Sequence, residues 1–91
     1  MEIDVAGQSW TLETFDPQAR DSGDMGRCDS KLGLISISSD LTGDVLKSTI
    51  IHEWLHGVFD IYGLGHTEEI VNVMAVELMR RGFRIEIKGG E

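Results

Sequence analysis

Residues 44–62 constrain the fold most, because they predict one long helix with two apolar stripes. The first stripe follows the i, i+4, i+7, i+11 spacing and the second runs beside it: Ile51, Leu55, Val58 and Tyr62, then Ile50, Trp54 and Ile61. A helix that is apolar on two sides is normally buried within its domain. The remaining sector of this helix is polar and needs a separate explanation: Thr49, His52, Glu53, His56 and Asp60.

The rest of the chain predicts a short sheet and a second helix. Alternating apolar residues predict strands at Leu34–Ser38 and 83–88, and the N-terminal residues predict a strand or a hairpin through Gly7 and Gln8. The polar, glycine-bearing residues 16–31 predict a loop. A second helix is expected from Thr67, as its N-cap, to about residue 81. Together these elements predict an α+β fold with about three strands packed on the two helices.

Composition limits the class of protein and its partners. The chain has 91 residues, 41% of them hydrophobic, which predicts one domain over residues 1–91. Sixteen acids against eight bases give a net charge of −8, which disfavours a nucleic-acid partner. The sequence has neither an apolar run long enough to cross a bilayer nor a signal peptide, so we expect a cytoplasmic protein without a membrane partner. Because Cys28 is the only cysteine, stability must come from packing, a partner or a metal.

The polar sector of the long helix contains an HExxH motif, His52-Glu53-Trp54-Leu55-His56. Residues four apart lie on one face of a helix, so both imidazoles can reach the same metal ion. Glu53 lies about 100° around the helix from His52, which places its carboxylate beside the ion, where it can take a proton from a metal-bound water. The alternative interpretation is a pair of histidines that face solvent or form hydrogen bonds on a surface helix.

A catalytic zinc ion usually has three protein ligands, and the sequence offers three candidates for the third. A second helix that folds back antiparallel would bring its first turn to the metal. Glu68 is favoured because Asn72 lies on the same face and could orient a histidine. Glu69, or Glu68 itself, could instead serve only to compensate the helix dipole. His66, in the preceding turn, is the other candidate.

Two further roles stay open at this point. Stabilising a developing oxyanion normally needs a donor besides zinc, and His66, Tyr62 or a group from a partner could supply it. Cys28 could act as an additional zinc ligand that keeps the site latent, although a passive thiol is the simpler interpretation.

The stretch from about Gly26 to Leu78 resembles small gluzincin-type zinc metallopeptidases of bacterial or phage type, and is similar to the metallopeptidase domain of the ImmA/IrrE class. The matching segments are Leu34–Ser38, the HExxH helix, and the helix that carries Glu68, Asn72, Met74 and Ala75. The resemblance implies a zincin-like fold and Zn²⁺ as cofactor. It also implies His52, His56 and Glu68 as metal ligands, with Glu53 as the catalytic residue that activates water.

In that family the substrate lies extended along an edge strand, for which Leu34–Ser38 is the expected counterpart. The function expected from the resemblance is hydrolysis of peptide bonds in one or few intracellular proteins. The negative charge favours a basic regulatory protein as that substrate. The alternative is a catalytically weak zinc-binding module that recognises a protein partner.

Overall fold

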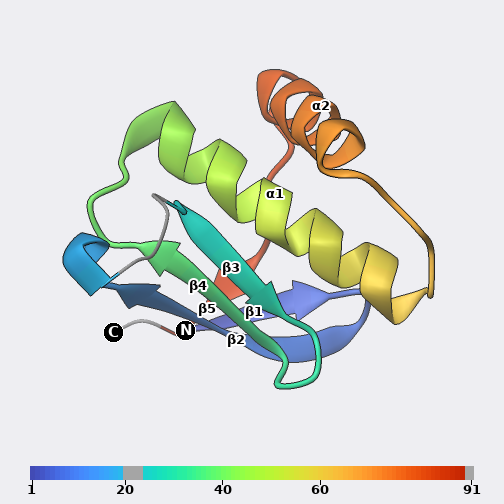
Figure 1. Cartoon of the computed structure of the whole chain (residues 1–91), viewed down its shortest axis with the longest axis horizontal. Coiled ribbons are helices and arrows are strands. Elements are labelled where there is room, and N and C mark those ends of the chain that lie inside the picture. Colours follow the sequence, from blue (N-terminus) through green and yellow to red (C-terminus); the bar gives the residue numbers. More distant parts are fainter. Residues whose placement is uncertain (20–23, 90–91) are drawn as a thin grey trace.

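The structure is a computed structural model that describes residues 1–19 and 24–89. It is an α+β domain, as predicted, in which helix α1 (Gly43–Ile61) lies between a sheet and helix α2 (Glu68–Arg80) (Figure 1). The described residues form five strands rather than the expected three or so. No helix within residues 1–19 and 24–89 combines the length and the apolar character that crossing a membrane requires.

The sheet has the strand order β3-β4-β2-β1-β5. Its strands are β1 (Glu2–Val5), β2 (Gln8–Phe15), β3 (Gly26–Asp29), β4 (Leu34–Ser38) and β5 (Ile87–Lys88). The predicted hairpin is confirmed, with its turn one residue earlier than expected: β1 and β2 pair antiparallel through Ala6 and Gly7, whose φ angles of 51° and 86° are both positive. This backbone matches the twist that favours two-residue hairpin turns. Strands β2 and β4 pair in parallel, whereas the other neighbours are antiparallel.

Three strand predictions are wrong in part. Strand β3 lies within the segment predicted as a loop, because its sequence Gly-Arg-Cys-Asp contains no alternation of large apolar residues. Strand β3 also pairs along β4, so Leu34–Ser38 is an internal strand and not the expected edge. The last predicted strand, 83–88, is reduced to Ile87–Lys88, which pair with β1.

The two-sided apolar character of α1 is confirmed by its packing. On one side, partly buried residues of α1 cover six buried residues of the sheet: Ile3, Val5, Trp10, Leu12, Ile35 and Ile37. On the other side, Ile51 and Leu55 pack with Val71 and Ala75 of α2. Tyr62 is 65% exposed, contrary to its place in the predicted stripe, because the helix ends at Ile61.

The approach of α1 to the sheet depends on Gly57. A Cβ atom at this position would lie 2.9 Å from Cζ3 of Trp10 and 3.0 Å from Cγ1 of Val5. Because real Cβ atoms do not approach other heavy atoms so closely, any larger residue would push the helix and the sheet apart. The glycine therefore helps to set the height of the polar sector of α1 above the sheet.

Candidate metal centre

The turn between the helices brings the first residue of α2 back to the middle of α1. Gly63 has a φ angle of 69°, and the backbone N–H of Leu64 donates to the carbonyl of Phe59 at 2.8 Å, which ends α1 and reverses the chain. The hydroxyl of Thr67 then accepts from the backbone N–H of Ile70 at 3.2 Å. The prediction of Thr67 as N-cap is thereby confirmed, and Glu68 follows it as the first helical residue.

His52, His56 and Glu68 converge at this point. Nε2 of His52 lies 3.0 Å from Oε2 of Glu68, and Nε2 of His56 lies 2.7 Å from Oε1 of the same carboxylate. The two Nε2 atoms are 3.2 Å apart. Among the described residues, these three form the group whose ligand atoms lie close enough together to hold one metal ion.

The donor set and spacing fit a zinc ion. Zinc takes histidine nitrogen and carboxylate oxygen at about 2.0–2.2 Å, so neighbouring ligand atoms in a tetrahedral site lie about 3.3 Å apart. The three observed separations of 3.2, 3.0 and 2.7 Å require the carboxylate to withdraw by only a few tenths of an ångström. The side chain of Glu68 is 68% exposed, so it has the freedom to make that adjustment.

Glu53 lies beside this group but is held differently. Only 8% of the residue is exposed. A Cβ atom on Gly26 of β3 would lie 3.0 Å from Cγ and 3.1 Å from Oε2 of Glu53, so the glycine lets β3 lie directly against this carboxylate. Burial, with the negative charges of Glu68 and Asp24 in smaller measure, raises the pKa of Glu53 to about 7. A carboxyl group with this pKa can accept and release a proton near neutral pH.

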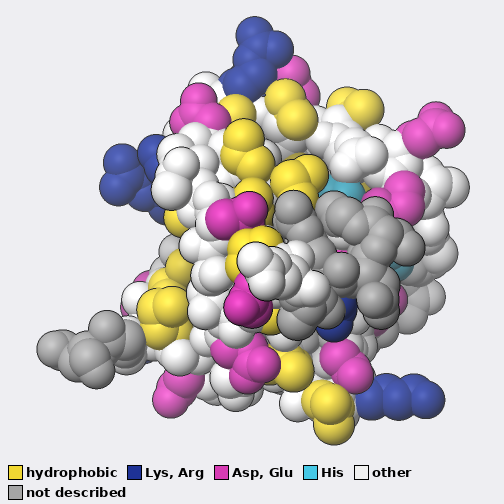
Figure 2. All heavy atoms as spheres, turned by 60° about the vertical axis from the view of Figure 1, so that its left-hand side comes forward, with side chains coloured by type: hydrophobic (Ala, Val, Ile, Leu, Met, Phe, Trp, Pro, Cys, Tyr) yellow, Lys and Arg dark blue, Asp and Glu magenta, His cyan; other side chains and the backbone are white. Residues whose placement is uncertain are grey.

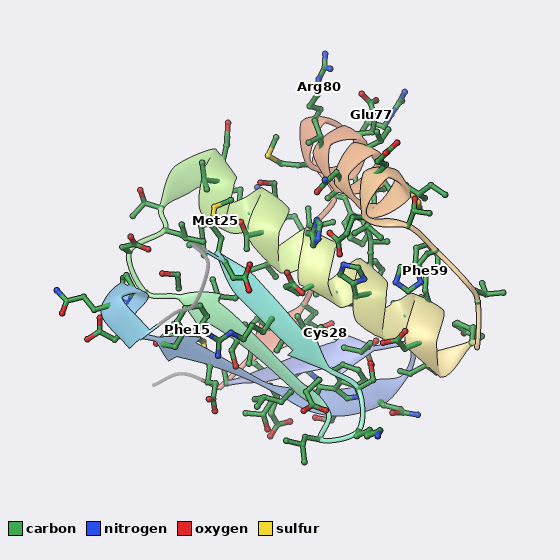
Figure 3. All side chains as sticks on the ribbon, viewed as in Figure 1. Phe15, Met25, Cys28, Phe59, Glu77 and Arg80 are labelled. Atoms are coloured by element: carbon green, nitrogen blue, oxygen red, sulfur yellow. The ribbon has the colours of Figure 1, made fainter. Side chains whose placement is uncertain are left out.

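A cavity of 630 Å³ contains the two histidines and both glutamates. Its walls come from Met25 and Gly26 around the start of β3, from the middle of α1, and from Asn72, Ala75 and Val76 of α2. Figure 3 shows Met25 beside α1, just before β3 begins. Histidine surface is visible among hydrophobic and acidic side chains on the face drawn in Figure 2. The cavity thus combines acidic groups with an apolar wall.

The other candidate residues lie outside the group of three. Glu69 is exposed, and Cys28 of β3 has its Sγ 3.9 Å from the hydroxyl of Ser30 (Figure 3). Burial raises the pKa of Cys28 to about 11, so its thiol stays protonated at neutral pH. Tyr62 is absent from the residues that line the cavity. None of the three is brought to the site by the described structure.

The residue that contacts a histidine from behind is His66 and not Asn72. Nε2 of His66 lies 2.8 Å from Nδ1 of His56, on the side of the ring away from Glu68, whereas Asn72 lines the cavity. Burial lowers the pKa of His56, and the neighbouring histidines add to this effect while Glu68 opposes it. The sequence indicates His66 as a possible ligand or oxyanion donor, but its contact with Nδ1 of His56 depends on the shape of the turn. The glycines of that turn are the only signal of this shape in the sequence.

The fold and the site together define a small α+β protein with a group of two histidines and one glutamate that could hold a metal ion. Comparisons of the chain with models of protein families, with curated proteins and with solved structures found no match.

Proposed function

We propose that the chain is a zinc-dependent metallopeptidase that hydrolyses peptide bonds in one or few protein substrates. The observation that carries the proposal is the convergence of His52, His56 and Glu68 within one cavity that also contains the buried Glu53. Three protein ligands leave a coordination position open for water or substrate, which is typical of catalytic rather than structural zinc sites. A purely structural site would be expected to have four protein ligands.

Each residue has a distinct role in this proposal. His52 and His56 would hold a zinc ion, and Glu68 would supply the anionic ligand from α2. A bound zinc ion would polarise the substrate carbonyl and make water more acidic. Glu53 takes the proton from water and passes it to the leaving amine. Its burial supports this role, because a carboxylate with little hydration is a stronger base than one in bulk water.

Strand β3 is the surface on which we propose that the substrate binds, in place of Leu34–Ser38. Within the described sheet, β3 is the end strand and pairs only with β4. Gly26 of β3 lies against Glu53, so a peptide that pairs with the free edge of β3 would pass close to this carboxylate. The acidic groups of the cavity and the net charge of −8 favour a basic protein as the substrate.

The decisive experiment combines metal analysis with the Glu53→Gln variant. Protein purified without chelators should contain one zinc per chain, in the wild type and in this variant alike. When each is incubated with a proteome from the host, new N-termini should form with the wild-type protein and be lost with Glu53→Gln. Glu69→Gln is the matched control, because it removes a neighbouring carboxylate outside the site, and it should retain activity.

The failures of this experiment are distinguishable. A wild-type protein that binds no zinc would contradict the metal centre itself. Stoichiometric zinc with identical proteome profiles for the wild type and Glu53→Gln would contradict the peptidase and favour the zinc-binding interaction module.

A further inference from the structure

His66 forms the middle of a chain of contacts that starts at a backbone carbonyl and ends at the candidate metal centre. Its Nδ1 lies 3.1 Å from the carbonyl oxygen of Leu64, and its Nε2 lies 2.8 Å from Nδ1 of His56. Nε2 of His56 in turn faces Glu68 at 2.7 Å. Each of the two rings thus has both of its nitrogen atoms in contact with a partner.

The carbonyl at the start of the chain requires a proton on Nδ1 of His66, which sets the tautomers of both rings when they are neutral. A carbonyl oxygen can only accept a hydrogen bond, so Nδ1 of His66 must carry the proton and donate it to Leu64. In neutral His66 the other nitrogen, Nε2, is then an acceptor. Nδ1 of His56 must therefore be the donor in the contact between the two rings, and Nε2 of neutral His56 is left with a free lone pair.

That lone pair faces a carboxylate oxygen of Glu68 across 2.7 Å. Two acceptors at this distance repel each other unless they share a proton or a metal ion binds both of them. Nε2 of His52 borders the same space, 3.2 Å from Nε2 of His56. The hydrogen-bond chain therefore prepares a nitrogen donor at the place where the ligand atoms converge.

His66 is held in position by contacts other than that with His56. Its ring packs on Phe59, which lies one helical turn beyond His56 on α1, with ring centroids 5.0 Å apart (Figure 3). The turn before it is closed by the backbone bonds of Gly63 to Asp60 and of Leu64 to Phe59. His66 is half-buried as a result. A partner held in this way keeps the ring of His56 at one orientation without relying on a bound ion.

We propose that His66 is a positioning residue that fixes the tautomer and orientation of His56 for metal binding. The inference rests on the metal centre proposed above, and it assigns to His66 a part in the affinity of that centre for zinc. Of the two histidines, His56 is the one whose Nδ1 contacts a second imidazole ring, so His56 is the ligand that is prepared in advance. The partner is an imidazole ring rather than a carboxylate, so it orients His56 without adding negative charge to the site.

The first test measures zinc affinity by competition with a chelator for three variants and the wild type. His66→Leu keeps a side chain of similar bulk but removes the acceptor, and should bind zinc about 10- to 100-fold more weakly. His66→Gln places an amide oxygen near the position of Nε2 and should restore most of the affinity. Glu69→Gln, in which the charge is lost nearby but the chain of contacts is intact, should bind as the wild type does.

The cobalt-substituted proteins and the tautomers provide readouts that a merely structural role would not change. His66→Leu should alter the visible absorption spectrum of bound Co²⁺, whereas His66→Gln should leave it close to that of the wild type. In the wild-type protein, nitrogen NMR should show the Nδ1–H tautomer for His56 and for His66. This measurement does not depend on whether His66→Leu folds.

The outcomes separate this inference from the proposed function. If the wild type binds no zinc, both proposals are wrong. If it binds zinc and His66→Leu binds equally tightly with the same cobalt spectrum, the metal centre stands and the role of His66 is wrong. A proton on Nε2 of His66 in the wild type would also overturn the assignment, because His56 would then be an acceptor at Nδ1.

Discussion

The two apolar sides of α1 are covered very differently. The side that faces the sheet lies on six buried hydrophobic residues, whereas the side that faces α2 lies in a cluster of four, two of which belong to α2. Several large apolar residues of α2 are exposed, among them Ile70 at 50% and Val73 at 64%. The sheet and α1 thus form the main core, and α2 is attached by a smaller one. The candidate metal centre, whose ligands come from α1 and from the first residue of α2, lies where the attachment is weaker.

Of the changes considered, zinc binding should most strongly reduce the difference in stability between α2 and the main core. An ion that joins the helices stabilises the folded protein by about 4 kcal/mol at a free concentration near 1,000 times Kd, or more than about 15 °C in Tm for a domain of this size. Without zinc, amides of α2 should exchange hydrogen faster than those of β2 and β4, and with zinc the two should become similar. Equal exchange in both states, or an unchanged Tm after zinc removal, would contradict a site that joins the helices.

Truncating one residue in each core comes next. Ile35 in the main core is fully buried, and Ile35→Ala should lower the free energy of unfolding by about 2–5 kcal/mol. Val71 in the smaller core is also fully buried, and Val71→Ala should cost about 1–2 kcal/mol. Urea unfolding of the metal-free proteins measures both values. In the folded proteins Val71→Ala should weaken zinc binding more than Ile35→Ala does, and the reverse order would remove the distinction between the two cores.

The polar sector between the two cores should make stability depend on pH. In the folded metal-free protein the pKa of Glu53 is about 7, above its usual value of 4.5, so the folded state holds this proton more tightly. The contribution of protonated Glu53 to the stability of the folded state is fully present below pH 4.5 and is lost as the pH rises to about 7. The free energy of unfolding of Glu53→Gln, relative to that of the wild type, should therefore rise by about 2–3 kcal/mol as the pH is raised from acid to pH 8. A constant difference between the two proteins across this range would show that Glu53 is not desolvated.

Gly57 tests how tightly the main core is packed. Alanine favours a helix by about 1 kcal/mol over glycine, but overpacking costs about 1–3 kcal/mol, so Gly57→Ala should lower stability by about 1 kcal/mol. The expected clash is with Trp10 and Val5. Gly65→Ala is the control, since a Cβ atom there meets nothing within 4 Å. Thermal unfolding compares the two, and a more stable Gly57→Ala protein would mean that α1 is free to move away from the sheet.

The parts of the fold that follow from local periodicity could be predicted from the sequence. The two apolar stripes of α1 predicted that other elements pack on both sides of this helix. The positive φ angles at Ala6 and Gly7 agree with the expected hairpin. Strand β3 could not be predicted in this way, because a four-residue edge strand that packs through Gly26 and Cys28 has no apolar alternation. Strand order is a property of pairing between distant segments, so the edge was assigned to the wrong strand.

The candidate site also has parts that follow from local sequence spacing and parts that do not. The spacing of His52 and His56 is a local property of a helix, and the glycines after α1 indicated that α2 folds back, which together predicted the group that includes Glu68. The partner of His56 could not be predicted, because the contact depends on the exact path of the turn at residues 63–66. Asn72 has the right spacing on α2, yet its side chain lines the cavity.

The short pairing of β1 with β5 has a consequence for how the chain folds and opens. It joins residues 2–3 to residues 87–88, so almost the whole chain lies within the loop that it closes. Closing so long a loop has an entropic cost that must be offset by contacts, and both residues of β5 are exposed. We therefore expect β5 to dock after the rest of the sheet has formed and to detach first under mild denaturant. The amide of Ile87 would then report a partial opening in which β1 and β2 remain paired.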